Sequence, residues 1–185
     1  MYASSSAVYG DDPALPKMEE RVGRLLSPYA ASKRANELYG QVFFQCYGLP
    51  TIGLRYFNVF GPRQDPGGAY AAVIPLWIQS LTKNQPCYIN GDGSTSRDFC
   101  YVEDVVQANI KAALCQNSQV YGDVFNIGCG KRTTLLELYS ILKRELGLDD
   151  GVQPLYREIR LGDITHSVAN IDKARNLIGY DPIYS

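Results

Sequence analysis

The chain has 185 residues, of which 45% are hydrophobic and 20% charged, a composition typical of one soluble globular unit. Its net charge of −1 at pH 7 gives no field that would favour nucleic acid or an anionic membrane. No apolar run approaches the roughly 20 residues that span a bilayer. Five cysteines without a CxxC pair and a single histidine favour a reducing cytoplasm and predict no metal site.

The predicted elements alternate between strands and helices along the chain. Residues 1–6 are typical of a strand that ends in a polar turn, and Ser27 followed by Pro28 predicts the start of a helix to about Tyr47. The β-branched and aromatic run 51–57 predicts a strand, and the glycine- and proline-rich run 59–69 a loop. Further helices are expected at 73–82, 103–115, 135–146 and 172–178, and further strands at 85–90, 98–102 and 124–127. This alternation favours an α/β fold with a sheet that is parallel at least in part.

Two glycine pairs partly match the fingerprint of a dinucleotide-binding turn. Gly91-Asp-Gly93 and Gly128-Cys-Gly130 both follow predicted strands, but each lacks the third glycine of the fingerprint. Gly130-Lys131 is no phosphate-binding P-loop either, because Arg132 stands where Ser or Thr is required. Both pairs are therefore predicted to be ordinary turns.

Tyr29 and Lys33 form the strongest local candidate for chemistry. Residues four apart share one face of a helix, and an ammonium beside a phenol favours the phenolate and lowers the tyrosine pKa. Such a phenol can act as a base near neutral pH. A surface Tyr–Lys pair is the common alternative. The serines Ser4, Ser5 and Ser6 strengthen the catalytic interpretation of Tyr29 and Lys33, because a hydroxyl at the end of a strand can hydrogen-bond the same substrate oxygen.

Several ordered motifs extend this pair over nearly the whole chain. They are SSSAVYG at 4–10, SPYAASK at 27–33, LRYFNVFGPR at 54–63, YINGDG at 88–93, RDF at 97–99, FNIG at 125–128 and RLGD at 160–163. In this order they resemble the extended short-chain dehydrogenase/reductase family, and within it the bacterial UDP-N-acetylglucosamine 4-epimerases. The resemblance implies the C-terminal part of a Rossmann-like parallel sheet plus a small mixed α/β substrate-binding domain.

The resemblance assigns catalytic roles in an NAD-dependent 4-epimerisation of a UDP-hexose through a 4-keto intermediate. Tyr29 is the expected base for the sugar 4-hydroxyl, while NAD takes the hydride from C4 and returns it to the other face of the turned sugar. Lys33 is expected to lower the Tyr29 pKa and to bind the nicotinamide ribose. Ser5 corresponds to the catalytic Ser/Thr with Ser6 as its helper, and Tyr56 is placed with the cofactor.

The resemblance also assigns the UDP-sugar site. The residues expected to contact the substrate are Asn58, Ala72, Val73, Trp77, Tyr88, Asn90, Arg97, Arg160, Asp163 and Ser167. Arg97 and Arg160 are expected to bracket the diphosphate, a role that suits charged forks. Ser167 occupies a position where a large aromatic residue would exclude a C2 substituent, so its small side chain favours UDP-GlcNAc/UDP-GalNAc over UDP-glucose/UDP-galactose. Without the motifs, each arginine would be interpreted as a solvated surface charge, and Trp77 as core.

Related dehydratases carry Asp and Glu after the catalytic hydroxyl, where this chain has Ser6 and Ala7, so dehydration is not expected. Other nucleotide-sugar oxidoreductases on this scaffold, or a UDP-sugar-binding module without catalysis, remain alternatives.

Because the glycine-rich half of the family's fold is not found, we expect a fragment, inactive alone, with residues 1–60 from the NAD-binding domain. Residues 61–185 are expected to be mainly substrate-binding, with one segment returning to the Rossmann part. A cytoplasmic homodimer without nucleic-acid, membrane or metal partners is the expected form.

Overall fold

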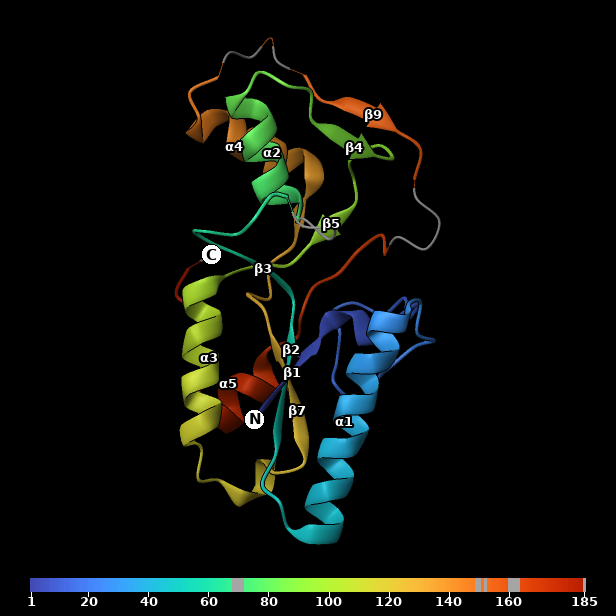
Figure 1. The fold of residues 1–185 in the computed structure, drawn as a ribbon, viewed down its shortest axis with the longest axis vertical. Coiled ribbons are helices and arrows are strands. Elements are labelled where there is room, and N and C mark those ends of the chain that lie inside the picture. Colours follow the sequence, from blue (N-terminus) through green and yellow to red (C-terminus); the bar gives the residue numbers. More distant parts are fainter. Residues whose placement is uncertain (68–71, 149–150, 152, 160–163, 185) are drawn as a thin grey trace.

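The computed structural model describes residues 1–67, 72–148, 151, 153–159 and 164–184. These residues form two lobes that follow one another along the long axis of the molecule (Figure 1). We call them the sheet lobe, built on β1, β2 and β7, and the small lobe, built on α2, α4 and the short strands around them. No helix in the described ranges is long and apolar enough to cross a membrane.

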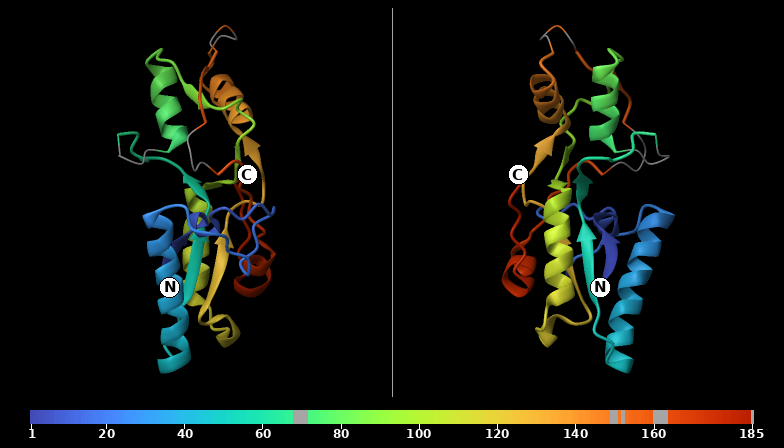
Figure 2. Two further views of the ribbon diagram at one scale, coloured as in Figure 1. Left: turned by 90° about the vertical axis from the view of Figure 1, so that its right-hand side faces the viewer. Right: turned by 60° about the vertical axis from the view of Figure 1, so that its left-hand side comes forward.

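The sheet lobe is a parallel three-stranded sheet in the order β1-β2-β7, formed by Tyr2–Ser5, Ile52–Tyr56 and Asp123–Ile127. Helix α1 (Pro28–Tyr47) covers one face of this sheet, while α3 (Val102–Leu114) and α5 (Asp172–Ile178) lie on the other (Figure 2). The apolar core fills the α3 face, where Leu54, Phe125 and Ile127 pack against Ala108 of α3 and Ala174 of α5.

Local sequence signals explain the bounds of α1. The Ser27 hydroxyl accepts a hydrogen bond from the Ala30 amide at 3.1 Å and so caps the first turn. Pro28 occupies the first helical position, where its missing N–H costs nothing. At the other end Gly48 adopts a left-handed conformation with φ of 66°, which closes the helix.

The small lobe is assembled from three two-stranded sheets and two helices. Strand β3 (Asn58–Phe60) pairs in parallel with β6 (Phe99–Tyr101), β4 (Tyr88–Asn90) with β9 (Leu155–Arg157), and β5 (Ser96–Arg97) antiparallel with β8 (Thr133–Thr134). Helices α2 (Val73–Thr82) and α4 (Leu135–Glu145) enclose its apolar core, in which Trp77 meets Tyr139 edge to face at 5.8 Å. Two short 3-10 helices, η1 (Ser6–Tyr9) and η2 (Ser118–Val120), complete the described elements.

The predicted α/β class and all the long helices are confirmed, but several short strands differ from expectation. Residues 59 and 60 are predicted to be loop, yet they continue as β3, because β6 supplies backbone partners that no local pattern reveals. The strand expected at 85–90 is shorter and begins at Tyr88. Strands β5, β8 and β9 lie outside the predicted set, since each has only two or three residues.

Candidate active site

The predicted catalytic residues gather at the carboxyl end of the parallel strands. Ser5 ends β1 opposite Tyr56, which ends β2, while Tyr29 lies in the first turn of α1. The Lys33 Nζ lies 5.6 Å from the centroid of the Tyr29 ring and donates to the Ala3 carbonyl at 3.2 Å. In open α/β sheets this edge is where ligands bind.

The hydroxyls in this group differ in how they are engaged. Ser5 Oγ accepts a hydrogen bond from the Ala7 amide at 3.1 Å and thereby caps η1, which begins at Ser6. Tyr29 is 54% exposed. The Tyr56 hydroxyl instead donates to Asn109 of α3 at 2.9 Å, and burial raises the pKa of this phenol. Ser5, Lys33 and Tyr29 therefore present polar groups at the sheet edge, whereas the Tyr56 hydroxyl is engaged inside the sheet lobe.

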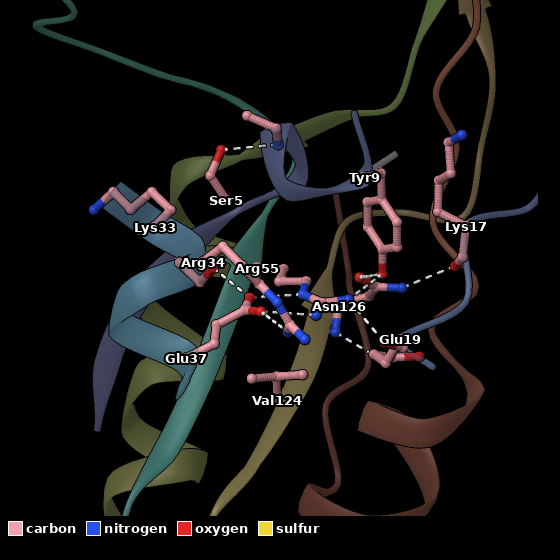
Figure 3. A network of polar contacts seen from close by, with 12 residues as sticks. Ser5, Tyr9, Lys17, Glu19, Lys33, Arg34, Glu37, Arg55, Val124 and Asn126 are labelled. Carbon is pink, nitrogen blue, oxygen red and sulfur yellow. Dashed lines mark hydrogen bonds and ion pairs between the residues drawn. The ribbon is translucent and has the colours of Figure 1, made fainter. Parts of the chain in front are cut away.

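Directly beneath this edge lies a buried ion pair that the sequence analysis missed. Arg55 donates from Nε and Nη2 to the two oxygens of Glu37, at 2.7 and 2.9 Å, and is itself fully buried (Figure 3). Ser4 donates to Glu37 at 2.6 Å, and Arg34 at 2.8 Å. Burial acts to raise the pKa of Glu37, but the bonds and charge of Arg55, with those of Ser4 and Arg34, outweigh it and lower that pKa.

The network continues across the sheet to β7. Arg55 Nη1 donates to the Tyr9 hydroxyl at 3.0 Å, and this hydroxyl donates to Asn126 Oδ1 at 2.6 Å. Burial raises the pKa of Tyr9 to about 12, although Arg55 and Asn126 oppose the shift. Ser4, Arg55 and Asn126 are register partners on the three neighbouring strands. A charged residue inside the apolar run TIGLRYF was the signal that a buried partner had to exist.

A cavity of about 250 Å³ in the small lobe contains most of the predicted substrate residues. Asn58 contributes from the strand that follows β2, and Arg97 donates to the carbonyls of Ser96 and Thr165 at 2.9 and 3.3 Å. The Arg157 guanidinium lies 3.2 Å from the centroid of the Tyr88 ring. The predicted residues in the lining are Asn58, Ala72, Val73, Trp77, Tyr88, Asn90 and Arg97; Thr95, Phe60, Phe99, Ile159 and Thr165 are among those not foreseen.

The other three predicted substrate residues are not among the described residues of this lining. Arg160 and Asp163 lie outside the described residues. Ser167 is 6% exposed, and its amide donates to the Ser96 carbonyl at 3.1 Å. Among the described residues Ser167 is not part of the cavity wall, although Thr165, two positions earlier, is.

A second cavity, of about 850 Å³, shares Phe60, Ile74 and Phe99 with the first. Its further walls are mostly apolar and include Leu138 and Tyr184. It is larger, but it offers few groups that could recognise a charged nucleotide. The smaller cavity, which has Asn58, Asn90 and Arg97 in its wall, is therefore the better candidate for a polar ligand. The described residues contain no cluster of His, Cys, Asp or Glu suited to a metal.

Comparison with known families agrees with this architecture. Residues 1–128 match the model of the NAD dependent epimerase/dehydratase family, and the chain belongs to that family. A putative UDP-glucose 4-epimerase of Methanocaldococcus jannaschii is 40% identical over 97% of this chain and 56% of its own length. The UDP-glucose 4-epimerase of Mycolicibacterium smegmatis is 36% identical with the same coverage. The chain thus spans little more than half the length of these relatives.

Solved structures show the same relationship. A UDP-N-acetylglucosamine 4-epimerase from Methanobrevibacter ruminantium M1, in complex with UDP-N-acetylmuramic acid, superimposes with a TM-score of 0.90 at 42% identity, over 98% of this chain and 56% of that one. A UDP-glucose 4-epimerase with UDP-glucose from Thermotoga maritima gives a TM-score of 0.90 at 36% identity, over 99% and 58%. The family resemblance inferred from the motifs and the Rossmann-like fold class are confirmed.

Proposed function

We propose that this chain carries the catalytic base and the nucleotide-sugar site of an NAD-dependent UDP-hexose 4-epimerase. The observation that supports this most is the cavity, whose wall contains seven of the residues that the motifs assign to the substrate. Asn58 in that wall lies two residues beyond the carboxyl end of β2. Through Asn58 the cavity wall comes within two residues of Tyr56, the register partner of Ser5.

In this proposal Tyr29 accepts the proton of the sugar 4-hydroxyl, and Ser5 bonds the same oxygen. The form of Tyr29 that accepts this proton is the phenolate, which Lys33 stabilises before the transfer, because its ammonium lies 5.6 Å from the ring centroid. Asn58 and Arg97 hold the diphosphate side of the substrate while the hexose turns. Uneven binding of this kind, firm on the nucleotide and weak on the sugar, leaves the intermediate free to present its other face.

The residues at the sheet edge fit a nicotinamide cofactor. Lys33 gives one of its three N–H donors to the Ala3 carbonyl, which leaves others for ribose hydroxyls. Its position at the carboxyl edge of parallel strands is the usual place for a dinucleotide. When bound, NAD would supply the hydride acceptor and donor for C4. Ser6 and Ala7 provide no acid or base after Ser5, which favours epimerisation over dehydration.

We propose UDP-GlcNAc/UDP-GalNAc as the substrate pair. In the family that the motifs resemble, the position of Ser167 lies beside the C2 substituent, where a small residue leaves room for an N-acetyl group; the described cavity wall does not include Ser167. The 42% identical Methanobrevibacter enzyme is named as a UDP-N-acetylglucosamine 4-epimerase. The relatives named for UDP-glucose, at 36 to 40% identity, make UDP-glucose the second candidate.

Calorimetric titration with UDP-GlcNAc and UDP-glucose, each with and without NAD, tests the proposal. We expect saturable binding that favours the N-acetyl sugar, and weaker binding of both sugars to Tyr88→Ala. Tyr156→Ala is the matched control, since this exposed tyrosine of β9 is not among the described residues of the cavity wall and its loss should leave this binding unchanged. A folded chain that binds neither sugar would refute the proposed site. Binding that is indifferent to NAD would favour the second function, a UDP-sugar-binding module without catalysis.

We also propose a cytoplasmic homodimer that associates through α1. The outer face of this helix carries exposed Leu38, Tyr39, Val42 and Phe43, and Tyr47 beyond them is 76% exposed. Contiguous apolar side chains of this kind commonly mark a protein interface. Sedimentation should give a dimer for the natural chain and a monomer for Tyr39→Glu/Phe43→Glu; a monomer in both would exclude this interface.

A further inference from the structure

Two contacts fasten α1 to the end of β1 at the candidate active site, and a third fastens it to β2. Lys33, one turn after Tyr29, donates to the Ala3 carbonyl at 3.2 Å. Glu37, a further turn along, accepts from the Ser4 hydroxyl at 2.6 Å and from Arg55 of the neighbouring strand. Residues four apart lie on one face of a helix, so Tyr29, Lys33 and Glu37 form one row along α1. The last member of this row is 3% exposed.

Glu37 is the point at which these contacts converge. Its two oxygens together take hydrogen bonds from Ser4 on β1, from Arg55 on β2 and from Arg34 within α1. The bidentate bonds from Arg55 fix the plane of the carboxylate, because the guanidinium fork is rigid. Arg55 is held in turn by the Tyr9 hydroxyl and by the Glu19 carbonyl, both at 3.0 Å. The carboxylate therefore has little freedom to shift along the helix axis.

We propose that Glu37 is a positioning residue, with Ser4 and Arg55 as its partners, which sets the place of Tyr29 and Lys33 against Ser5; this rests on the proposed function. Ser4 is adjacent to Ser5 in the chain, and Glu37 shares the helix with the base. A bond between them holds the proton acceptor and the neighbouring hydroxyl in one rigid frame. Tyr29 is exposed in its first turn, so it depends on the helix behind it for its position.

The helix offers a matched control at its other end. Thr51 Oγ1 donates to the Gly40 carbonyl at 2.9 Å and so also links α1 to the strand side of the sheet lobe. Thr51→Val removes this bond with little change in shape. Ser4→Ala removes the single bond to Glu37 and keeps the ion pair, so it serves if Glu37→Gln does not fold.

Amide exchange and ring resonances in the labelled chain test the proposal without cofactor or substrate. In Glu37→Gln and Ser4→Ala we expect residues 32–37 to exchange about fivefold faster or more, while residues 41–47 keep their rates. The ring resonances of Tyr29, assigned with Tyr29→Phe, should move in both variants and stay in place in Thr51→Val. Thr51→Val should speed exchange only near Gly40.

An even rise in exchange along α1 in all three variants, with the Tyr29 resonances unmoved, would overturn the proposal and leave Glu37 a purely structural residue. The readout is independent of the sugar titration. If the chain binds no UDP-sugar while the Tyr29 resonances respond as expected, the proposed function fails and the positioning of the Tyr29 end of α1 by Glu37 stands.

Discussion

The two lobes hold their functional side chains in place by different means. At the end of the sheet lobe, directional bonds between buried polar groups run from Glu37 through Arg55 and Tyr9 to Asn126. In the small lobe, the cavity wall depends on apolar packing around Trp77 and on strands of two or three residues. The proposed base Tyr29 thus lies on a helix that directional polar bonds hold in place, whereas the proposed nucleotide-sugar pocket rests on apolar packing that can adjust.

The largest loss of stability is expected when only one member of the buried Glu37–Arg55 ion pair is replaced. Arg55→Met leaves the buried Glu37 carboxylate without its bidentate partner, and loss of one member of a buried pair costs about 3 to 5 kcal/mol of stability. Urea unfolding followed by circular dichroism measures this loss. The double variant Glu37→Leu/Arg55→Met should recover most of it, since a well-packed apolar pair replaces the charges. Equal losses in the single and double variants would show that the ion pair is not the cause.

Leu81→Ala tests the apolar packing of the small lobe. It should lower the free energy of unfolding by about 3 kcal/mol, through lost contacts and the cavity left behind. Leu81 is 2% exposed and packs in the same cluster as Trp77. Trp77 is the chain's single tryptophan, so its fluorescence follows the unfolding of this lobe. Leu76→Ala, at an exposed position on the same helix, should cost much less. If circular dichroism shifts as far as the fluorescence, the lobes unfold together.

Alkaline pH should weaken the sheet lobe through Tyr9, whose pKa burial raises to about 12. Below pH 10 the phenol is protonated in both the folded and the unfolded chain. Between pH 10 and 12 only the unfolded chain releases the proton, so stability falls as pH rises, by about 2 to 3 kcal/mol for a shift of this size. Tyr9→Phe should remove this contribution from the curve. A parallel pH dependence in both proteins would contradict the assignment, and the exposed Tyr39→Phe is the control.

The smallest effect concerns Tyr88, a residue of the cavity wall whose ring lies under the Arg157 guanidinium. An exposed cation–π contact contributes about 1 kcal/mol or less, so Arg157→Ala should lower the midpoint of the Trp77 transition only slightly. Arg144→Ala is a suitable control, because the exposed guanidinium of Arg144 pairs with the neighbouring Glu145 on the surface of α4. A loss of stability as large as that of Leu81→Ala would mean that the contact between Arg157 and Tyr88 is a main contributor to the stability of the small lobe.

The sequence predicted those helices and strands whose bounds are determined by residues close by in the chain. Ser27, Pro28 and Gly48 define α1 through capping and backbone preference, so its bounds agree with the structure. Strands β8 and β9 have no such signal, because Thr133–Thr134 and Leu155–Arg157 become strands only where distant partners meet them. Strand β3 likewise forms only because β6 pairs with it, whereas the glycines and prolines that follow it predicted a loop.

The same distinction between local sequence signals and contacts of distant segments applies to the candidate site. Seven of the residues that the motifs assign to the substrate lie in the cavity wall, but Thr95 and Thr165, which join them there, were not predicted, since they come from segments far apart in sequence. Arg55 could have been flagged as a charge in an apolar strand, yet its partner Glu37 looked like an ordinary helical surface acid. The identity of that partner depends on how α1 packs against the sheet, which periodicity alone does not specify.

The pairing of β2 with β7 also bears on how fast the chain can fold. Ile52 is the register partner of Asp123, and the bond from Tyr9 to Asn126 joins residues 117 positions apart. Strands β3 to β6 and helices α2 and α3 all lie in the loop that this pairing closes. Closing a long loop costs entropy before native contacts repay it, and such topologies fold slowly. A small lobe that forms early shortens the flexible part of this loop, so the packing around Trp77 should govern the rate at which the distant sheet closes.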